Sequence, residues 1–227
     1  MNAIAHPAFS VALTIAAYSL GIKLHNQWKW VPPIVVACVP IIVVLLLCHE
    51  PYAVYNRGGN LLSWWLGPAT VALATPMYRN GKVLRASLPR LALIVVIGSI
   101  VGMVTAGVTA WLFGAPLPVV MSAVPKSVTT PIAIEVCREL KGIPQITIAM
   151  VLLTGVLGAS VAPPLLRLVH VRNHHAIGAA TGTAAHGIGT ASLVRRSEMQ
   201  ATASSWAMAA AGVFTSLLAI LLRLFLH

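Results

Sequence analysis

Charged residues are scarce in this chain, and aspartate is missing altogether. Only 8% of the 227 residues are charged, and the acidic residues are four glutamates. Soluble domains carry about 25% charged residues, so this composition excludes an ordinary soluble domain. Few carboxylates also leave little with which to build acid–base pairs or hard-metal cages. We therefore expect no enzyme activity, no metal site and no cofactor.

Cysteine is also scarce, and the three cysteines show no paired spacing. A disulfide framework and a cysteine metal site are therefore not expected. The net charge is +11, but the basic residues are scattered among short connections without interleaved aromatics. That pattern disfavours a nucleic-acid partner and fits the basic loops of a membrane protein. The chain does not begin with the basic stretch and cleavage site of a signal peptide. Its first apolar segment is therefore expected to be a retained helix.

Apolar residues make up 58% of the chain and fall into eight long segments. At this length and hydrophobicity only helices suit a lipid bilayer. The sequence therefore predicts an all-α, multi-pass integral membrane protein. The segments are residues 8–24, 33–47, 61–78, 88–113, 117–140, 143–169, 176–194 and 201–226.

The number of crossings has two solutions, seven or eight. Eight crossings place most Lys and Arg residues on one side, as the positive-inside rule expects. A re-entrant hairpin over residues 117–140 gives seven crossings and a slightly weaker asymmetry. The short connections predict a single transmembrane domain over residues 1–227.

The two halves of the chain, about 1–114 and 115–227, resemble each other. Residues 67–75 (GPATVALAT) align with residues 178–186 (GAATGTAAH), and a basic loop and an apolar helix follow each. Repeated halves with interrupted segments are typical of transporters that bind substrate near the bilayer midplane. An inverted repeat needs an odd number of crossings per half, which eight crossings do not supply.

Residues 125–131 (PKSVTTP) join a cation, a backbone interruption and three hydroxyls between two apolar half-segments. Thr130 fits a helix N-cap and Pro131 fits the first helical position. The unpaired N–H groups of that helix would attract an anion. Lys126, Ser127, Thr129 and Thr130 are therefore candidate ligands for a small carboxylate. Two other roles for Lys126 stay open, a structural cation between broken helices and a side chain that reaches the membrane surface.

Residues 178–191 (GAATGTAAHGIGTA) form a second candidate site, rich in glycine and threonine. His186 has small neighbours, so its ring could bind an anion or carry a proton for symport. Thr190 is the accompanying hydroxyl, while Gly182, Gly187 and Gly189 permit a break or a close crossing. A tight helix crossing with one core histidine is the alternative.

Two further groups complete the candidates. Pro68, Thr70 and Pro76 interrupt the matching segment of the first half, where helix packing is the simpler role. Glu135 lies one helical turn beyond Pro131 and, if buried, is a second candidate for proton coupling. Pairing of Glu135 with Lys126 or another basic neighbour is the alternative.

Four stretches of the chain resemble the LrgB/CidB family. They are residues 125–133 (PKSVTTPIA), 142–144 (GIP), 184–191 (AAHGIGTA) and 67–78 (GPATVALATPMY). The resemblance extends from about Pro33 to the C-terminus. Residues 137–141 (CRELK) are more charged than the family pattern, and residues 195–197 (RRS) lack its acidic character.

This resemblance implies two functions of different classes. Some members are transporters of small monocarboxylates such as pyruvate, and chloroplast relatives move glycolate and glycerate. Bacterial members are holin-like or antiholin-like regulators of murein hydrolases and lysis, paired with a small LrgA/CidA-like membrane protein. The resemblance also implies a fold related to the broken-helix antiporters and bile-acid carriers.

Carboxylate transport by alternating access across the bacterial inner membrane is the leading prediction, and the lysis regulator is the alternative. Substrate, coupling ion and a homodimeric assembly stay open.

Overall fold

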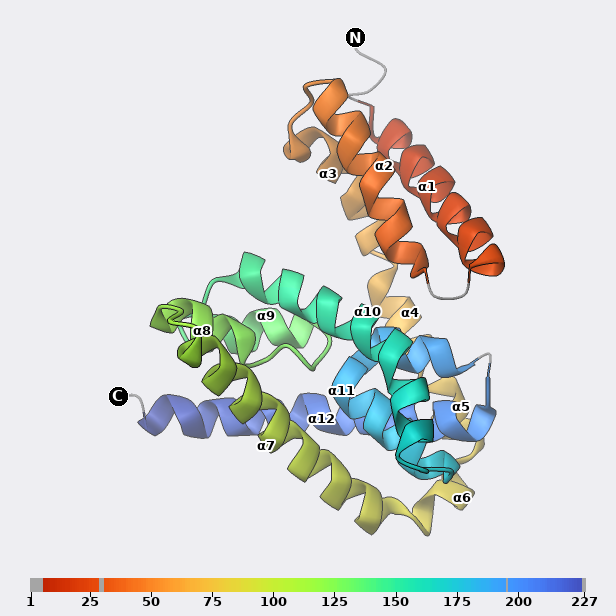
Figure 1. The fold of residues 1–227 in the computed structure, drawn as a ribbon, viewed down its shortest axis with the longest axis vertical. Coiled ribbons are helices and arrows are strands. Elements are labelled where there is room, and N and C mark those ends of the chain that lie inside the picture. The colour runs from red at the N-terminus through yellow and green to blue at the C-terminus, as the bar shows by residue number, and fades with distance from the viewer. Residues whose placement is uncertain (1–5, 29–30, 195, 226–227) are drawn as a thin grey trace. The chain divides into compact units, whose positions relative to one another are not determined.

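The computed structural model describes residues 6–28, 31–194 and 196–225, and all regular structure within them is helical. The chain divides into two compact units, residues 1–71 and 72–227. This division does not test the predicted single domain or the predicted pseudo-repeats. Figure 1 follows the helices from the N-terminus, in red, to the C-terminus, in blue.

The first unit is built around α1 (Pro7–Gln27), which packs against α2 (Pro33–Leu47) and α3 (Tyr52–Ser63). Glycine permits the closest approaches between these helices. A Cβ atom on Gly21 would lie 2.3 Å from the carbonyl oxygen of Pro33. The hydroxyls of Thr14 and Tyr55 also lie 2.7 Å apart. The short α4 (Leu66–Ala72) leads into the second unit.

The second unit holds the remaining helices, which include both candidate sites around Lys126 and His186. The helices are α5 (Thr75–Arg79), α6 (Gly81–Arg85), α7 (Leu88–Leu112), α8 (Leu117–Ala123), α9 (Thr130–Glu139), α10 (Pro144–Leu168), α11 (His174–Val194) and α12 (Glu198–Phe225). The long helix α12 packs along α11 and also contacts α7 and α9.

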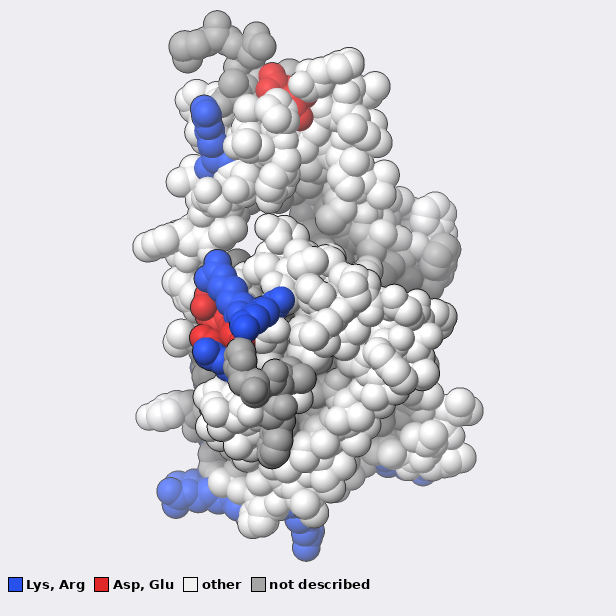
Figure 2. Space-filling model, turned by 90° about the vertical axis from the view of Figure 1, so that its left-hand side faces the viewer, with Lys and Arg blue, Asp and Glu red and all other residues white. Residues whose placement is uncertain are grey.

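Apolar side chains face outward in this unit and hydroxyls face inward. On α7, Val101 and Val104 are each more than 50% exposed, whereas Ser99 is 4% exposed. On α12, Thr202 and Ser204 are fully buried while Leu221 is 52% exposed. On the face that Figure 2 shows, charged side chains gather in small groups with wide uncharged surface between them. An apolar exterior with hydroxyls buried between the helices is expected of a chain whose solvent is lipid.

Four helices in the described part of the chain are long and apolar enough to cross a membrane. They are Pro7–Gln27, Leu88–Leu112, Pro144–Leu168 and Glu198–Leu224. The chain is therefore an all-helical membrane protein, as the composition predicts. The count of seven or eight crossings is not confirmed by these four helices.

Candidate functional site

The residues around Lys126 form a non-helical turn between α8 and α9. The turn covers residues 124–129, and α9 begins at Thr130. Thr129, not Thr130, is the N-cap residue, with φ −63° and ψ 146°. The predicted helix start is thus correct within one residue, and Pro131 lies in the first turn where it removes no hydrogen bond. The Thr129 side chain makes no capping hydrogen bond, so the first N–H groups of α9 are not capped by this hydroxyl.

Lys126 lies in this turn and is partly buried. Its Nζ atom donates to the hydroxyl of Ser127 at 3.3 Å. Among the described residues the ion pairs are Glu135–Arg138 and Glu139–Arg223, so none involves Lys126. An ammonium with one neutral partner keeps donors for an anion.

The end of α8 lies beside the start of α10, so the chain between them goes out and returns, and residues 117–141 form a first hairpin. Ser122, at the end of α8, accepts a hydrogen bond at its hydroxyl from the main-chain N–H of Ile143 at 2.7 Å. Its carbonyl accepts from the Thr147 hydroxyl at 2.9 Å. Leu117 and Lys141, from opposite ends of the hairpin, line one pocket. Residues 117–139 therefore do not form one straight helix.

A second reversal lies inside α11 at His186, whose φ of 40° and ψ of −134° are not helical. The two ends of α11 are neighbours, because Nδ1 of His174 lies 3.1 Å from the Ser197 hydroxyl. Beyond the break, a Cβ atom on Gly189 would lie 3.0 Å from the Thr181 side chain. Eight residues of continuous helix span about 12 Å, so the chain folds back at His186.

Both predicted crossing counts treat residues 176–194 as one crossing, whereas the chain folds back within this segment. The count of seven or eight crossings therefore stays unconfirmed. Gly187 and Gly189, which flank Ile188 directly after His186, are two of the glycines expected to permit a break or a close crossing.

The His186 ring is 4% exposed and packs against α10. Its Nε2 atom lies 3.0 Å from the carbonyl oxygen of Val151. A carbonyl only accepts, so Nε2 carries the proton and Nδ1 is the second ring nitrogen. The ring lies over Gly155, where a Cβ atom would come within 2.9 Å of Nε2. The predicted room for the ring is thus supplied across the helix interface by Gly155.

Thr190 is engaged within the protein. Its hydroxyl donates to the main-chain carbonyl of His186 at 2.8 Å and lies 2.8 Å from the Ser204 hydroxyl. Gly182 packs closely on the carbonyl of Ser204, where a Cβ atom would lie 2.3 Å away. At Gly187, by contrast, a Cβ atom would meet only the Met208 sulfur at 3.8 Å. Thr190 therefore holds the broken helix together and connects it to α12.

The two reversals share neighbours on α7 and α10. Val128, next to the Lys126 turn, belongs to one buried cluster with Ala133 and Val151. His186 bonds the carbonyl of that same Val151. The turn that holds Lys126 and the break at His186 thus meet at one residue of α10, Val151.

The shared neighbours on α7 are two glycines one helical turn apart. Gly102 faces the Ser127 hydroxyl and Gly98 faces Thr183. The hydroxyls of Ser99, Thr181 and Thr183 are buried and have no hydrogen-bond partner among the residues that the structure describes. Buried hydroxyls normally have a partner, so this region has hydrogen-bonding capacity for water or a ligand.

Glu135 lies outside this region. It is exposed on α9 and pairs with Arg138 at 2.7 Å, so the condition of burial is not met and the alternative, a basic neighbour, is what the structure shows. Pro68 belongs to the first unit. The side chain of Thr70 lies outside the described residues. No group of three potential metal ligands occurs within the described ranges.

Two hydroxyls of α12 hold the interrupted segment at residues 73–76, and the sequence did not predict them. The hydroxyl of Thr202 lies 3.1 Å from the carbonyl of Pro76, and the hydroxyl of Ser205 donates to the carbonyl of Leu73. Both hydroxyls lie on α12, three residues apart, on one face. Hydroxyls at that spacing in an alanine-rich apolar helix are the signal that could have identified them.

The comparisons identify the family of the chain. A multi-spanning membrane protein with polar chain reversals in its interior is the class that the fold defines. The model of the LrgB-like family matches residues 14–225, and the chain belongs to this family.

Three relatives illustrate the match. The chain is 37% identical to the uncharacterized protein YwbG of Bacillus subtilis over 91% of its own length and 92% of the relative. It is 32% identical to the antiholin-like protein LrgB of Bacillus mycoides, with 92% of each chain covered. It is 30% identical to the holin-like protein CidB of Staphylococcus epidermidis, over 99% of its own length and 100% of the relative. No solved structure matches the chain.

Proposed function

We propose that this protein transports small monocarboxylates across the membrane by alternating access, with the substrate bound where the two chain reversals meet. The observation that carries the proposal is the convergence of the Lys126 turn and the His186 break on Val151 of α10. Interrupted helices that meet in the interior of a membrane protein are the usual site of substrate in secondary transporters.

We further propose that α7, α10 and α12 cross the membrane. The first hairpin, residues 117–141, and the second hairpin, α11 folded back at His186, enter it from opposite sides. Glu139 pairs with Arg223, which puts the base of the first hairpin beside the end of α12. His174 contacts Ser197 and Gln200, which puts the base of the second hairpin beside the start of α12. Since α12 separates these two places, the hairpins point toward each other.

The basic residues support an orientation for this arrangement. The side that holds the start of α12 carries most of them, and the positive-inside rule makes that side cytoplasmic. The basic residues described on that side are Arg79, Lys82, Arg85, Arg90, Arg167, Arg172 and Arg196, against Arg138, Lys141 and Arg223 on the other. The membrane would then be the cell's inner membrane.

The roles of the residues follow from this geometry. Lys126 would supply the charge that binds a carboxylate, and Ser127, Thr129 and Thr130 would supply hydroxyls. The N-terminus of α9 adds unpaired N–H groups and the positive end of a helix dipole. His186 would face the substrate from the second hairpin, with Thr190 holding its main chain in place.

Proton coupling through His186 is a weaker part of the proposal. Its support is a buried imidazole with one nitrogen bonded to Val151 and a second nitrogen, Nδ1, that can accept a proton. Exposed Glu135, paired with Arg138, gains no support as a second coupling residue.

Uptake by proteoliposomes tests the proposal. The purified protein should take up labelled pyruvate or glycolate with saturation. Lys126→Met should reduce uptake at limiting substrate at least tenfold, because the charge of a charge-assisted hydrogen bond is lost. Arg138→Gln is the matched control, since this exposed cation lies on α9 outside the turn. Equal uptake by the wild type and the Lys126→Met protein would reject the site.

The names of the relatives favour a second function more directly than transport. Proteins that match almost the whole chain are named antiholin-like LrgB and holin-like CidB. A regulator of lysis would act with a small LrgA/CidA-like membrane partner. Release of large dyes from liposomes, without saturation by any carboxylate, would support this function over the transporter.

A further inference from the structure

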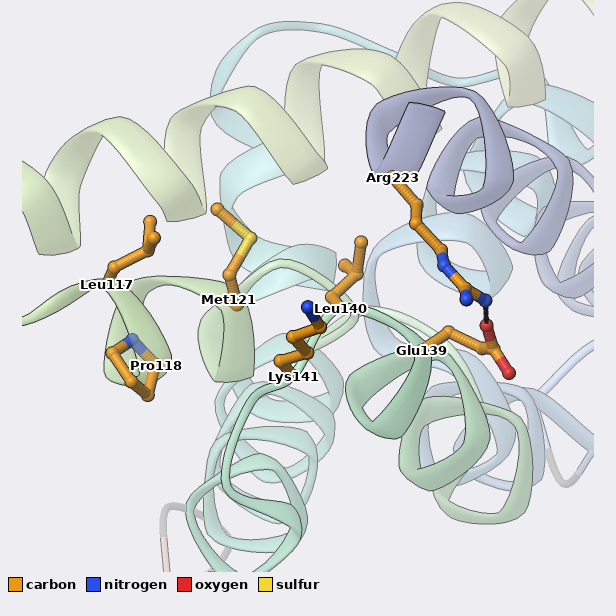
Figure 3. A pocket seen from close by; sticks show the side chains of 7 residues that line it. All are labelled: Leu117, Pro118, Met121, Glu139, Leu140, Lys141 and Arg223. Atoms are coloured by element: carbon orange, nitrogen blue, oxygen red, sulfur yellow. Dashed lines mark hydrogen bonds and ion pairs between the residues drawn. The ribbon is translucent and has the colours of Figure 1, made fainter. Parts of the chain in front are cut away.

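A pocket of about 290 Å³ opens at the base of the first hairpin, where α8 begins and α9 and α12 end. Its lining combines an apolar wall with three charged side chains (Figure 3). The wall consists of Leu117, Pro118, Met121 and Leu140, and the charged side chains are Glu139, Lys141 and Arg223. The pocket therefore suits a molecule with an apolar part and a charged part.

The charges of the pocket do not cancel. Arg223 pairs with Glu139, and Figure 3 shows the two side chains directed at each other. Lys141 forms no ion pair within the described ranges, and its amine lies between Met121 and Leu140 in the same view. One positive charge thus remains, which a ligand with one negative charge would balance.

The end of α9 explains the main chain at Lys141. Its φ of 58° lies in the left-handed region, and the N–H groups of Lys141 and Gly142 bond the carbonyls of Arg138 and Cys137, which caps the helix. His49 and His170 have the same conformation after α2 and α10. The cap fixes where the Lys141 side chain starts, beside the pocket that it lines.

The surroundings place the pocket at the membrane surface. Trp111 and Phe113, at the end of α7, are 67% and 88% exposed, as expected of an aromatic belt at the interface. Lys141 and Arg223 lie where apolar helices end. Basic pockets between membrane helices bind the headgroups of anionic lipids in the cytoplasmic leaflet. The same charge attraction acts on an anionic headgroup at the opposite surface, where the proposed orientation puts this pocket.

We infer that this pocket binds one anionic phospholipid. The phosphate contacts Lys141 and Arg223, and the start of an acyl chain lies against Leu117 and Met121. The lipid thereby connects the base of the first hairpin to the end of α12. Lys126 does not line this pocket, and the occupancy of the pocket does not depend on what the protein transports.

Lipid-dependent thermal stability in detergent, together with native mass spectrometry, tests the inference. Added phosphatidylglycerol should raise the Tm of the wild type and remain as one bound lipid, whereas phosphatidylcholine and inorganic phosphate should not. Lys141→Asn should weaken the apparent lipid affinity about fivefold, the effect of removing one cation near a membrane surface. Lys141→Arg keeps the charge and should keep the response.

The asparagine variant separates loss of binding from loss of folding. Asparagine tolerates a positive φ better than lysine, so the lipid-free variant should be at least as stable as the lipid-free wild type. Arg138→Gln removes a cation on the same side outside the pocket and should leave lipid binding unchanged.

Three results would overturn the inference. One is an equal response of Lys141→Asn and the wild type to phosphatidylglycerol. Another is equal stabilisation by free phosphate, which would make the site one for small anions. The third is a Tm that depends on protein concentration and not on lipid, which would assign the pocket to a second copy of the chain.

Discussion

His174 begins α11 and Ser197 lies three residues beyond its end, yet Nδ1 of the histidine lies 3.1 Å from the serine hydroxyl. This contact requires the chain between the two residues to reverse its direction. Cysteines introduced at both positions should therefore form a disulfide, in a protein whose Cys38, Cys48 and Cys137 have been replaced. A helix that crosses the bilayer once would hold the two thiols about 30 Å apart and give no cross-link.

The matched control pairs His174 with Arg223, which lies at the other end of α12. Cysteines at these two positions should stay reduced under the same oxidation. Gel mobility before and after reduction measures both pairs. A cross-link in the control alone would contradict the proposed hairpin.

The backbone conformation at His186 predicts that glycine is more stable than alanine at this position, the reverse of their order in a helix. In a continuous helix alanine is more stable than glycine by about 1 kcal/mol. The φ of 40° at His186 reverses this preference, because a Cβ atom is strained there and glycine is not. His186→Gly and His186→Ala both lose the ring and its bond to Val151. The difference in stability between them therefore reports the backbone conformation at position 186.

We expect His186→Gly to unfold at a higher temperature than His186→Ala, measured in one detergent at one pH. The reverse order would mean that α11 runs through position 186 as a regular helix. Uptake should be lost in both variants if the imidazole contacts the substrate.

Gly155 on α10 determines where the His186 ring can lie. A Cβ atom there would come within 2.8 Å of the ring carbon Cε1 and 2.9 Å of Nε2, closer than real contacts allow. Gly155→Ala should displace the ring, break its bond to Val151 and destabilise the protein by about 1–3 kcal/mol, the usual cost of overpacking.

Gly187→Ala is the matched control, since a Cβ atom there meets only the Met208 sulfur at 3.8 Å. It should change stability by less than about 0.5 kcal/mol. Thermal unfolding measures both variants, and labelled-carboxylate uptake reports whether the ring position matters for transport. Equal effects of the two substitutions would contradict the assigned packing.

The sequence predicts local features of this protein well, because they depend on residue types close together in the chain. Composition predicts the all-helical membrane class, and the Thr-Thr-Pro run places the start of α9 within one residue. The reversal at His186 is harder to predict. Small residues serve equally in a continuous close-packed helix and in a break, and the backbone of His186 and the position of Ser197 beside His174 distinguish them.

The exposure of Glu135 is not predictable from its spacing either. Its position one turn beyond Pro131 is correct, but the side of α9 that faces the core is set by contacts with α10 and α12. Those contacts bury Ala133 and Val136 and leave Glu135 outside, where Arg138 is within reach.

Ser205 stabilises the interruption before α5. Its hydroxyl donates to the Leu73 carbonyl, and no main-chain N–H in the described part of the chain bonds that carbonyl. Ser205 is 2% exposed, so removing its hydroxyl leaves a carbonyl without a partner in an apolar interior. Ser205→Ala should therefore destabilise the protein by about 1–3 kcal/mol.

Ser216→Ala is the control, because the Ser216 hydroxyl donates within its own helix to the Gly212 carbonyl at 2.9 Å. Since helical main-chain bonding also uses that carbonyl, the control should change stability by less than about 0.5 kcal/mol. Chemical unfolding of both variants in the same detergent measures the difference. If Ser205→Ala is as stable as Ser216→Ala, the interruption does not depend on α12, and a water molecule or a local hydrogen bond must satisfy the Leu73 carbonyl instead.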